Sequence, residues 1–194
     1  MAILKLMNTP RLSHKGARKK GKRLEHEVTK ALKNIGIDAK RVPLSGSLSW
    51  LKGDVTEFDT IKPHIHECKN CETVELPSWW RQTASQAING EVPVLHFTSN
   101  YQKVFTVLPV IDFDDLVFSY ERYRPELTIT ITDFPKRKGF WSFLVGKNMS
   151  HHVLLYKVDE IDLAIMPFDL YLMLRRQDIK RQAADVLQPS LAVS

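Results

Sequence analysis

The sequence predicts an α/β domain in which a mixed central sheet is flanked by helices. The chain has 194 residues, of which 43% are hydrophobic and 26% charged, which is typical of one globular domain rather than a disordered or fibrous chain. Over residues 21–98 the expected elements follow the order helix, strand, strand, strand, helix, strand. The segment VPVLHFT at 92–98 is an apolar run of the kind found in strands buried on both faces.

The first helix is predicted from residue 21, because apolar residues at 24, 28, 31, 32 and 35 repeat at helical spacing and Gly36 follows as a stop signal. Turn-rich residues 45–49 predict a loop, and Gly90 ends the second predicted helix. The remaining elements of this region are three strands, one at 39–42, one that begins at Asp54 and one at 63–69. They are followed by the helix at 79–89 and the strand at 92–98.

Beyond residue 103 two similar units are predicted, each a strand followed by an acidic turn and a helix. The strands are expected at 103–110 and 153–158, and the helices at 112–123 and 159–176. The whole chain is therefore expected to comprise a basic N-terminal arm (1–20), a core (21–103) and a C-terminal α+β extension (104–194).

Positive charge is concentrated near the N-terminus. Residues 1–41 hold twelve Lys or Arg against three acids, whereas the remainder carries a net charge of −3. A basic segment on a nearly neutral body favours a polyanionic partner such as DNA, because phosphate neutralisation releases counterions. The alternative is a solvated basic tail. The residues expected to contact phosphates are Lys15, Arg18, Lys19, Lys20 and Lys22.

The sequence contains no apolar run near the ~18 residues that span a bilayer and no secretory signal pattern. Its two cysteines, Cys68 and Cys71, cannot form a disulfide framework, which fits a reducing compartment. We therefore expect a soluble protein with an intracellular, cytoplasmic location and no membrane partner.

Acidic and basic side chains are expected to meet at one place in the predicted sheet. Asp54 begins one strand, Glu67 and Lys69 lie on the next, and Glu25 lies on the first helix. Because strand side chains alternate between faces, Glu67 and Lys69 point the same way and Cys68 points to the opposite face. Carboxylates suit a hard divalent ion such as Mg²⁺, and the lysine could stabilise charge on a phosphate.

Two other interpretations use the same part of the sequence. Glu67 and Lys69 could form a surface ion pair unrelated to Asp54, since the bare pattern D…E-x-K arises often by chance. Zinc is the second alternative, because imidazole and thiolate are its ligands. The zinc interpretation lacks the second ligand pair that a structural site normally needs; its candidate ligands are His64, His66, Cys68 and Cys71.

Five elements of the sequence, in order, resemble the archaeal-type Holliday junction resolvases of the PD-(D/E)xK superfamily of restriction-endonuclease-like nucleases. The resemblance covers about residues 16–98 and implies a restriction-endonuclease-like core. Two features depart from the pattern: the loop before Asp54 is long, and Gly53 stands where the superfamily has proline. The elements are residues 21–27 (GKRLEHE), Arg41, Ser45-Gly46-Ser47, Gly53-Asp54-Val55 and Glu67-Cys68-Lys69.

The resemblance implies a metal site that binds Mg²⁺, with Mn²⁺ as a substitute. Asp54 and Glu67 are its implied carboxylate ligands, joined by the backbone carbonyl of Cys68. Lys69 is implied as the catalytic lysine, and Glu25 as the helical glutamate that completes the site.

The identity of the helical glutamate stays open between Glu25 and Glu27. Both lie near the edges of the apolar stripe of the predicted helix, on opposite sides, so helical geometry does not separate them. Only the G-x-x-x-E spacing from Gly21 favours Glu25.

Further residues are implied to act on DNA. Ser47, or its neighbour Ser45, resembles a loop serine near the scissile phosphate, and Arg41 resembles a DNA-contacting arginine. Gln82 is a weaker candidate on the second predicted helix, where it shares a face with Gln86. Trp79 and Trp80 could stack on bases, although core packing is the more common role of such residues.

Together these observations predict a Mg²⁺-dependent, structure-selective DNA endonuclease that cuts Holliday junctions by paired phosphodiester hydrolysis. The resemblance implies 5′-phosphate and 3′-hydroxyl products. Paired cuts in a symmetric junction favour a homodimer. The alternatives are a restriction-like or nicking endonuclease acting on duplex DNA, and a non-catalytic DNA-binding module.

Overall fold

The structure, a computed structural model, describes residues 14–42, 53–58, 60–99, 102–118, 128–131 and 153–187. No helix in these residues is long and apolar enough to cross a membrane. The helices are α1 (His14–Asn34), α2 (Leu76–Ala84), α3 (Val110–Phe118) and α5 (Phe168–Leu187). The strands are β1 (Asp38–Arg41), β2 (Val55–Phe58), β3 (His64–Asn70), β4 (Val92–Thr98), β5 (Phe105–Pro109), β6 (Thr128–Ile131), β7 (Val153–Val158) and β8 (Ile161–Pro167).

The described strands form one mixed sheet in the order β1-β2-β3-β4-β5-β8-β7-β6. The pairs β3–β4 and β6–β7 are parallel, and the other neighbours are antiparallel. A mixed sheet flanked by helices confirms the predicted α/β fold class. The strands that follow residue 103 extend the same sheet, because β5 pairs with β4 and β8 pairs with β5. The domain boundary predicted at that residue stays a prediction.

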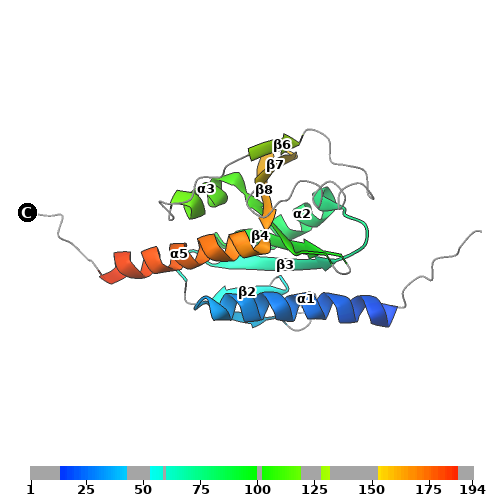
Figure 1. The fold of residues 1–194 in the computed structure, drawn as a ribbon, viewed down its shortest axis with the longest axis horizontal. Helices are drawn as coiled ribbons and strands as arrows, with labels where there is room; N and C mark the ends of the chain where they lie inside the picture. Colours follow the sequence, from blue (N-terminus) through cyan, green and yellow to red (C-terminus); the bar gives the residue numbers. More distant parts are fainter. Residues whose placement is uncertain are drawn as a thin grey trace, which may run out of the picture.

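The two faces of the sheet are covered by different helices. Along β4, Val92 and Val94 pack in a core cluster with α1, α3 and α5, while Leu95 and Phe97 pack on the other face with α2. This alternation follows from the two-residue period of a strand. Figure 1 shows the long helices α1, in blue, and α5, in orange to red, running across the view in the same direction. The face of β3 that carries Glu67 is therefore the α2 face.

Most predicted elements are confirmed, but three differ from the prediction, and β6 was not predicted. The second helix, expected at 79–89 and ended by Gly90, covers Leu76–Ala84 instead. Helix α1 begins at His14, so part of the predicted arm is helical; its Lys-rich sequence lacks apolar periodicity yet contains good helix formers. Residues 159–176 were expected to be one helix, and this is wrong: residues 161–167 form β8 and the helix begins at Phe168. The apolar run in β8 is compatible with a helix or a strand, and it forms a strand because it pairs with β5 and β7.

Both tryptophans of α2 contribute to the core. Trp80 is 2% exposed and Trp79 is 9% exposed, and both belong to the cluster that contains Phe97 and Phe105. The structure therefore supports the packing role for these residues rather than base stacking.

We predict that Gly53→Ala destabilises the fold far more than Gly90→Ala. Both glycines have positive φ, at 75° and 84°, so each substitution carries a backbone penalty of about 1 kcal/mol. A Cβ on Gly53 would also lie 2.6 Å from Cγ2 of Ile65 and 3.0 Å from the carbonyl oxygen of His66, whereas a Cβ on Gly90 meets nothing within 4 Å. We expect roughly 1–3 kcal/mol of additional loss at Gly53, measured by urea unfolding. Equal losses in the two variants would contradict the close approach.

Candidate active site

Antiparallel pairing of β2 with β3 places Asp54 beside the strand that carries Glu67 and Lys69. Val55 lies opposite His66 in the register, and the Asp54 N–H donates to the carbonyl oxygen of His66 at 2.8 Å. The carbonyl oxygen of Asp54 accepts from the Val42 N–H at 2.9 Å. The backbone of Asp54 is thus held from both sides, directly after the tight turn at Gly53.

The carboxylate of Asp54 is aimed at β3. Its Oδ2 accepts a hydrogen bond from the backbone N–H of Cys68 at 2.9 Å. Burial and then the charges of Glu67 and Glu25 raise the pKa of Asp54 from 3.8 to about 6, against the opposing effects of the Cys68 N–H and Lys69. The carboxylates of Glu67 on β3 and Glu25 on α1 are therefore close enough to act electrostatically on Asp54.

Glu67 and Lys69 lie on the same side of β3, as predicted from strand alternation. The Nζ of Lys69 is 2.6 Å from Oε1 of Glu67 and donates to Oε1 of Gln82 at 2.9 Å. Glu67 is only 4% exposed, and two amide side chains of the α2 region also donate to it: Gln82 to Oε1 and Gln86 to Oε2, each at 3.0 Å. Lys69 and Glu67 are consequently held in one orientation by their neighbours.

Of the two helical glutamates, Glu25 is the one whose charge acts on Asp54. Its Oε2 accepts a hydrogen bond from Nε of Arg41 at 2.5 Å. Glu27 is exposed and lines a separate hollow of about 350 Å³ between α1 and the segment after β4. The predicted DNA-contacting arginine is therefore engaged with the site's own glutamate.

The chemistry of these residues fits a hard divalent ion, for which Asp54, Glu67 and Glu25 could supply carboxylate oxygens. Besides burial, the charges of Glu67 and Glu25 raise the pKa of Asp54, and a bound cation would relieve this repulsion. Within the described ranges, no three His, Cys, Asp or Glu side chains already converge as a ligand set. Glu67 instead faces Lys69, and Glu25 faces Arg41, so these carboxylates would exchange an ion-pair partner for the ion.

Several predicted residues lie elsewhere or outside the described part of the chain. Ser45 and Ser47 are outside the described residues, as are the side chains of Lys15 and Arg18. Lys19 and Lys22 are exposed on α1, and Lys20 is 4.0 Å from Glu72.

The cysteines and histidines of β3 do not form the alternative zinc site. The Cys68 thiol is buried and Cys71 is exposed. Both ring nitrogens of His66 have protein partners: Nδ1 pairs with Nε2 of His96 at 2.9 Å, and Nε2 pairs with Oε1 of Glu57 at 3.2 Å.

Sequence reasoning did not find Gln86 as a partner of Glu67, nor the pairing of Arg41 with Glu25. The four-residue spacing of Gln82 and Gln86 was the available signal, because in a helix it would place both amides on one face. In the structure α2 ends at Ala84, and Gln86 lies in the turn that follows. What the spacing could not supply was the register that sets this face against β3.

Comparisons with protein-family models and with solved structures both give matches. A family model described as "Phage putative PDDEXK endonuclease" matches residues 16–150. The solved structure of Hjc from Archaeoglobus fulgidus, a Holliday junction resolvase from an archaeal hyperthermophile, matches with a TM-score of 0.37 and 19% sequence identity, over 46% of this chain and 75% of that one. No curated protein gives a significant sequence match.

We predict that Asp54→Asn stabilises the metal-free protein at alkaline but not at acidic pH. With a folded pKa of about 6 against 3.8 for the free side chain, the folded state binds the proton more tightly. The contribution of Asp54 to stability is therefore most favourable below about pH 4 and is lost as the pH rises through about 6. Asn keeps an oxygen for the Cys68 N–H and removes the charge. We expect a gain of about 2–3 kcal/mol at pH 8.

The measurement is urea unfolding in EDTA at about pH 3.5 and pH 8, with Asp114→Asn as an exposed control. The gain should vanish at the lower pH. A difference between Asp54→Asn and wild type that is the same at both pH values would show that Asp54 does not lie in this field of negative charge.

Proposed function

This chain belongs to the phage PDDEXK endonuclease family, and from that membership we propose that it is a Mg²⁺-dependent endonuclease that cuts branched DNA, with the four-way junction as its preferred substrate. The observation that carries the proposal is the electrostatic interaction between the carboxylates of Asp54 and Glu67 where β2 pairs with β3, with the Lys69 amine beside Glu67. Two carboxylates and an amine in this arrangement provide both a cation site and a donor for a phosphate oxygen.

Each residue has a distinct role in this proposal. Asp54, Glu67 and Glu25 would hold the divalent ion, together with the carbonyl oxygen of Cys68. A bound divalent ion supplies positive charge that stabilises the charge developing on the phosphate.

Lys69 would donate a hydrogen bond to a non-bridging phosphate oxygen and stabilise its charge in the transition state. Gln82 accepts from Lys69 and donates to Glu67, so its amide keeps the ammonium group next to the carboxylate. This places Gln82 as a residue that orients Lys69, in addition to any contact with DNA.

The proposed substrate rests on charge and on the sequence resemblance to junction resolvases. The N-terminal half of α1 exposes Lys19, Lys22 and Arg23, and Lys20 of the same helix lines a hollow with Asn70 and Cys71, just beyond Lys69 on β3. Phosphate contacts fix position without reading bases, so selectivity would come from the shape of a branched substrate.

Two further parts of the proposal go with this substrate. Paired cuts in a symmetric junction favour a two-fold homodimer. DNA as the substrate is also in keeping with the intracellular location expected from the sequence.

We predict that the protein cuts a labelled four-way junction faster than a linear duplex of the same sequence, only when Mg²⁺ or Mn²⁺ is present. Asp54→Asn and Lys69→Met should each lower the cleavage rate by at least about 100-fold, because the first removes a carboxylate ligand of the divalent ion and the second removes the cationic donor to the phosphate. DNA binding, measured in Ca²⁺ or EDTA, should stay within about threefold of wild type.

The matched control is Lys157→Met, which removes an exposed amine on β7 that pairs with Asp162. It should cleave at the wild-type rate. If the protein cut the duplex faster than the junction, duplex DNA and not the junction would be its preferred substrate. Full activity of Asp54→Asn would exclude this site as the centre of cleavage.

We also predict that Lys19→Ala/Arg23→Ala weakens DNA binding by removing phosphate contacts. The slope of log Kd against log salt should fall by about 2, since each lost phosphate contact lowers it by about 0.9. Lys30→Ala/Lys33→Ala removes the same charge from exposed positions in the other half of α1 and should leave the slope unchanged. Equal slopes for the two double variants would show that the N-terminal half of the helix makes no special contact.

A further inference from the structure

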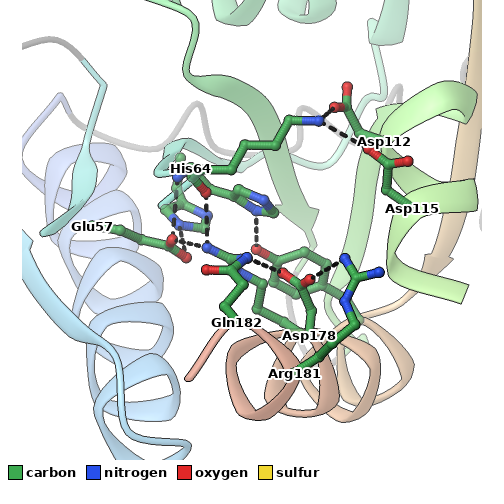
Figure 2. Close-up of polar contacts among 11 residues, drawn as sticks. Glu57, His64, Asp112, Asp115, Asp178, Arg181 and Gln182 are labelled. Atoms are coloured by element: carbon green, nitrogen blue, oxygen red, sulfur yellow. Dashed lines mark hydrogen bonds and ion pairs between the residues drawn. The ribbon is translucent and has the colours of Figure 1, made fainter. Parts of the chain in front are cut away.

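A buried polar network lies on the face of β3 opposite Glu67 and Lys69. It is unusual because it places several ionisable groups in the core, where they must supply each other's hydrogen bonds and opposite charges in place of water. Figure 2 shows the part of this network around Glu57, His64 and Asp178. The members are Glu57 of β2, His64 and His66 of β3, His96 of β4, Thr106 of β5, and Tyr171, Arg175 and Asp178 of α5.

Glu57 is the centre of this network and is 2% exposed. Its Oε2 accepts hydrogen bonds from Nη2 of Arg175 at 2.5 Å and from the backbone N–H of His64 at 3.1 Å. Burial acts to raise the pKa of Glu57, but its contacts with His64, His66 and Arg175 prevail and hold that pKa below its usual range. Glu57 is thus a buried carboxylate whose permanent cationic partner comes from α5.

Arg175 itself has no exposed surface. Besides Glu57, its Nη2 donates to the carbonyl oxygen of Lys62 at 3.1 Å, and its Nη1 pairs with Asp178. One guanidinium therefore joins α5 to β2 and to the segment that enters β3. Removal of such a group leaves a buried charge without compensation, which is far more damaging than loss of a surface ion pair.

The network reaches the candidate active site through His66. The ring of His66 bonds to Glu57 through Nε2, and its backbone carbonyl accepts the Asp54 N–H. The next residue on the strand is Glu67, whose side chain points to the other face. A continuous chain of contacts thus runs from Arg175 through Glu57 and His66 to the backbone of Asp54.

We propose that Arg175 is a positioning residue of the nuclease site: by neutralising and orienting Glu57, it sets the β2–β3 junction that brings Asp54 to Glu67. The proposal rests on the proposed function for its catalytic consequence. It assigns a role to the C-terminal segment, whose helix α5 becomes part of the scaffold of the active site although none of the described α5 contacts reaches Glu67 or Lys69.

The test uses variants of the full chain and two readouts. Arg175→Lys keeps a positive charge but cannot bond Glu57, Asp178 and the Lys62 carbonyl with the same geometry. We expect the backbone amides of Asp54 and Cys68 to exchange with deuterium at least tenfold faster, while amides of β7 and β8 keep their protection. We also expect DNA cleavage to slow at least tenfold with the DNA Kd within twofold, a pattern that general destabilisation would not produce.

A double-variant cycle tests whether Arg175 acts through Glu57. Arg175→Met should disturb both readouts more than Arg175→Lys, and Glu57→Gln/Arg175→Met should recover most of the loss. Glu57 is then neutral, and Asp178 keeps its contacts with Arg181 at 3.4 Å and with the Gln182 amide at 2.9 Å. If Arg175→Met does not fold, recovery of folded protein in the double variant is the corresponding result. A double variant that is no better than Arg175→Met would overturn the proposal.

Arg181→Ala is the matched control on the same helix. Arg181 contacts Asp178 at 3.4 Å, and none of its described contacts is to Glu57, so both readouts should match wild type. Wild-type exchange and cleavage in Arg175→Lys and Arg175→Met would also overturn the proposal. Amide exchange is measured without DNA, so it judges the positioning role even if the wild-type protein fails to cut the junction.

Discussion

The pairing of β2 with β3 is the constraint on which the candidate site depends. Asp54 and Glu67 are separated along the chain, and only the antiparallel register brings the Asp54 N–H to His66 and its carboxylate to the Cys68 N–H. Both bonds are made to the backbone of β3, so they fix Asp54 relative to the strand irrespective of the rotamers of the β3 side chains. The repulsion between Asp54 and Glu67 is a cost of this register, and it is the property that makes the place attractive to a cation.

The residues that carry chemistry were predictable because their signals are local. Strand alternation placed Glu67 and Lys69 on one face, and Gly53-Asp54 marked the start of the neighbouring strand. The family match confirms the PD-(D/E)xK assignment made from these motifs. The partners of these residues were harder to predict, because Gln86 and Arg41 act through the packing of α2 and β1 against the site. A sequence pattern specifies a face of an element, but the contact across that face depends on tertiary register.

The C-terminal half illustrates a different limit. Residues 161–167 contain an apolar run that is compatible with a helix or a strand, and the acidic residues before it resemble a helix start. Asp159, with φ of 53°, instead makes the turn between β7 and β8, and pairing with β5 then settles the structure. Arg175 was equally hidden, because nothing in the sequence separates it from the other basic residues of its helix, Arg176, Lys180 and Arg181, or points to a carboxylate on another element.

The Arg175–Glu57 pair also bears on when the enzyme can become active during its synthesis. Its two members lie 118 residues apart, and the sheet can assemble its first strands long before α5 has left the ribosome. A nascent chain that lacks α5 would have to bury an uncompensated carboxylate to bring β2 and β3 into register, and the energetic penalty disfavours that state. The dependence of an early strand on a late helix would thus keep an unfinished nuclease from acting on DNA.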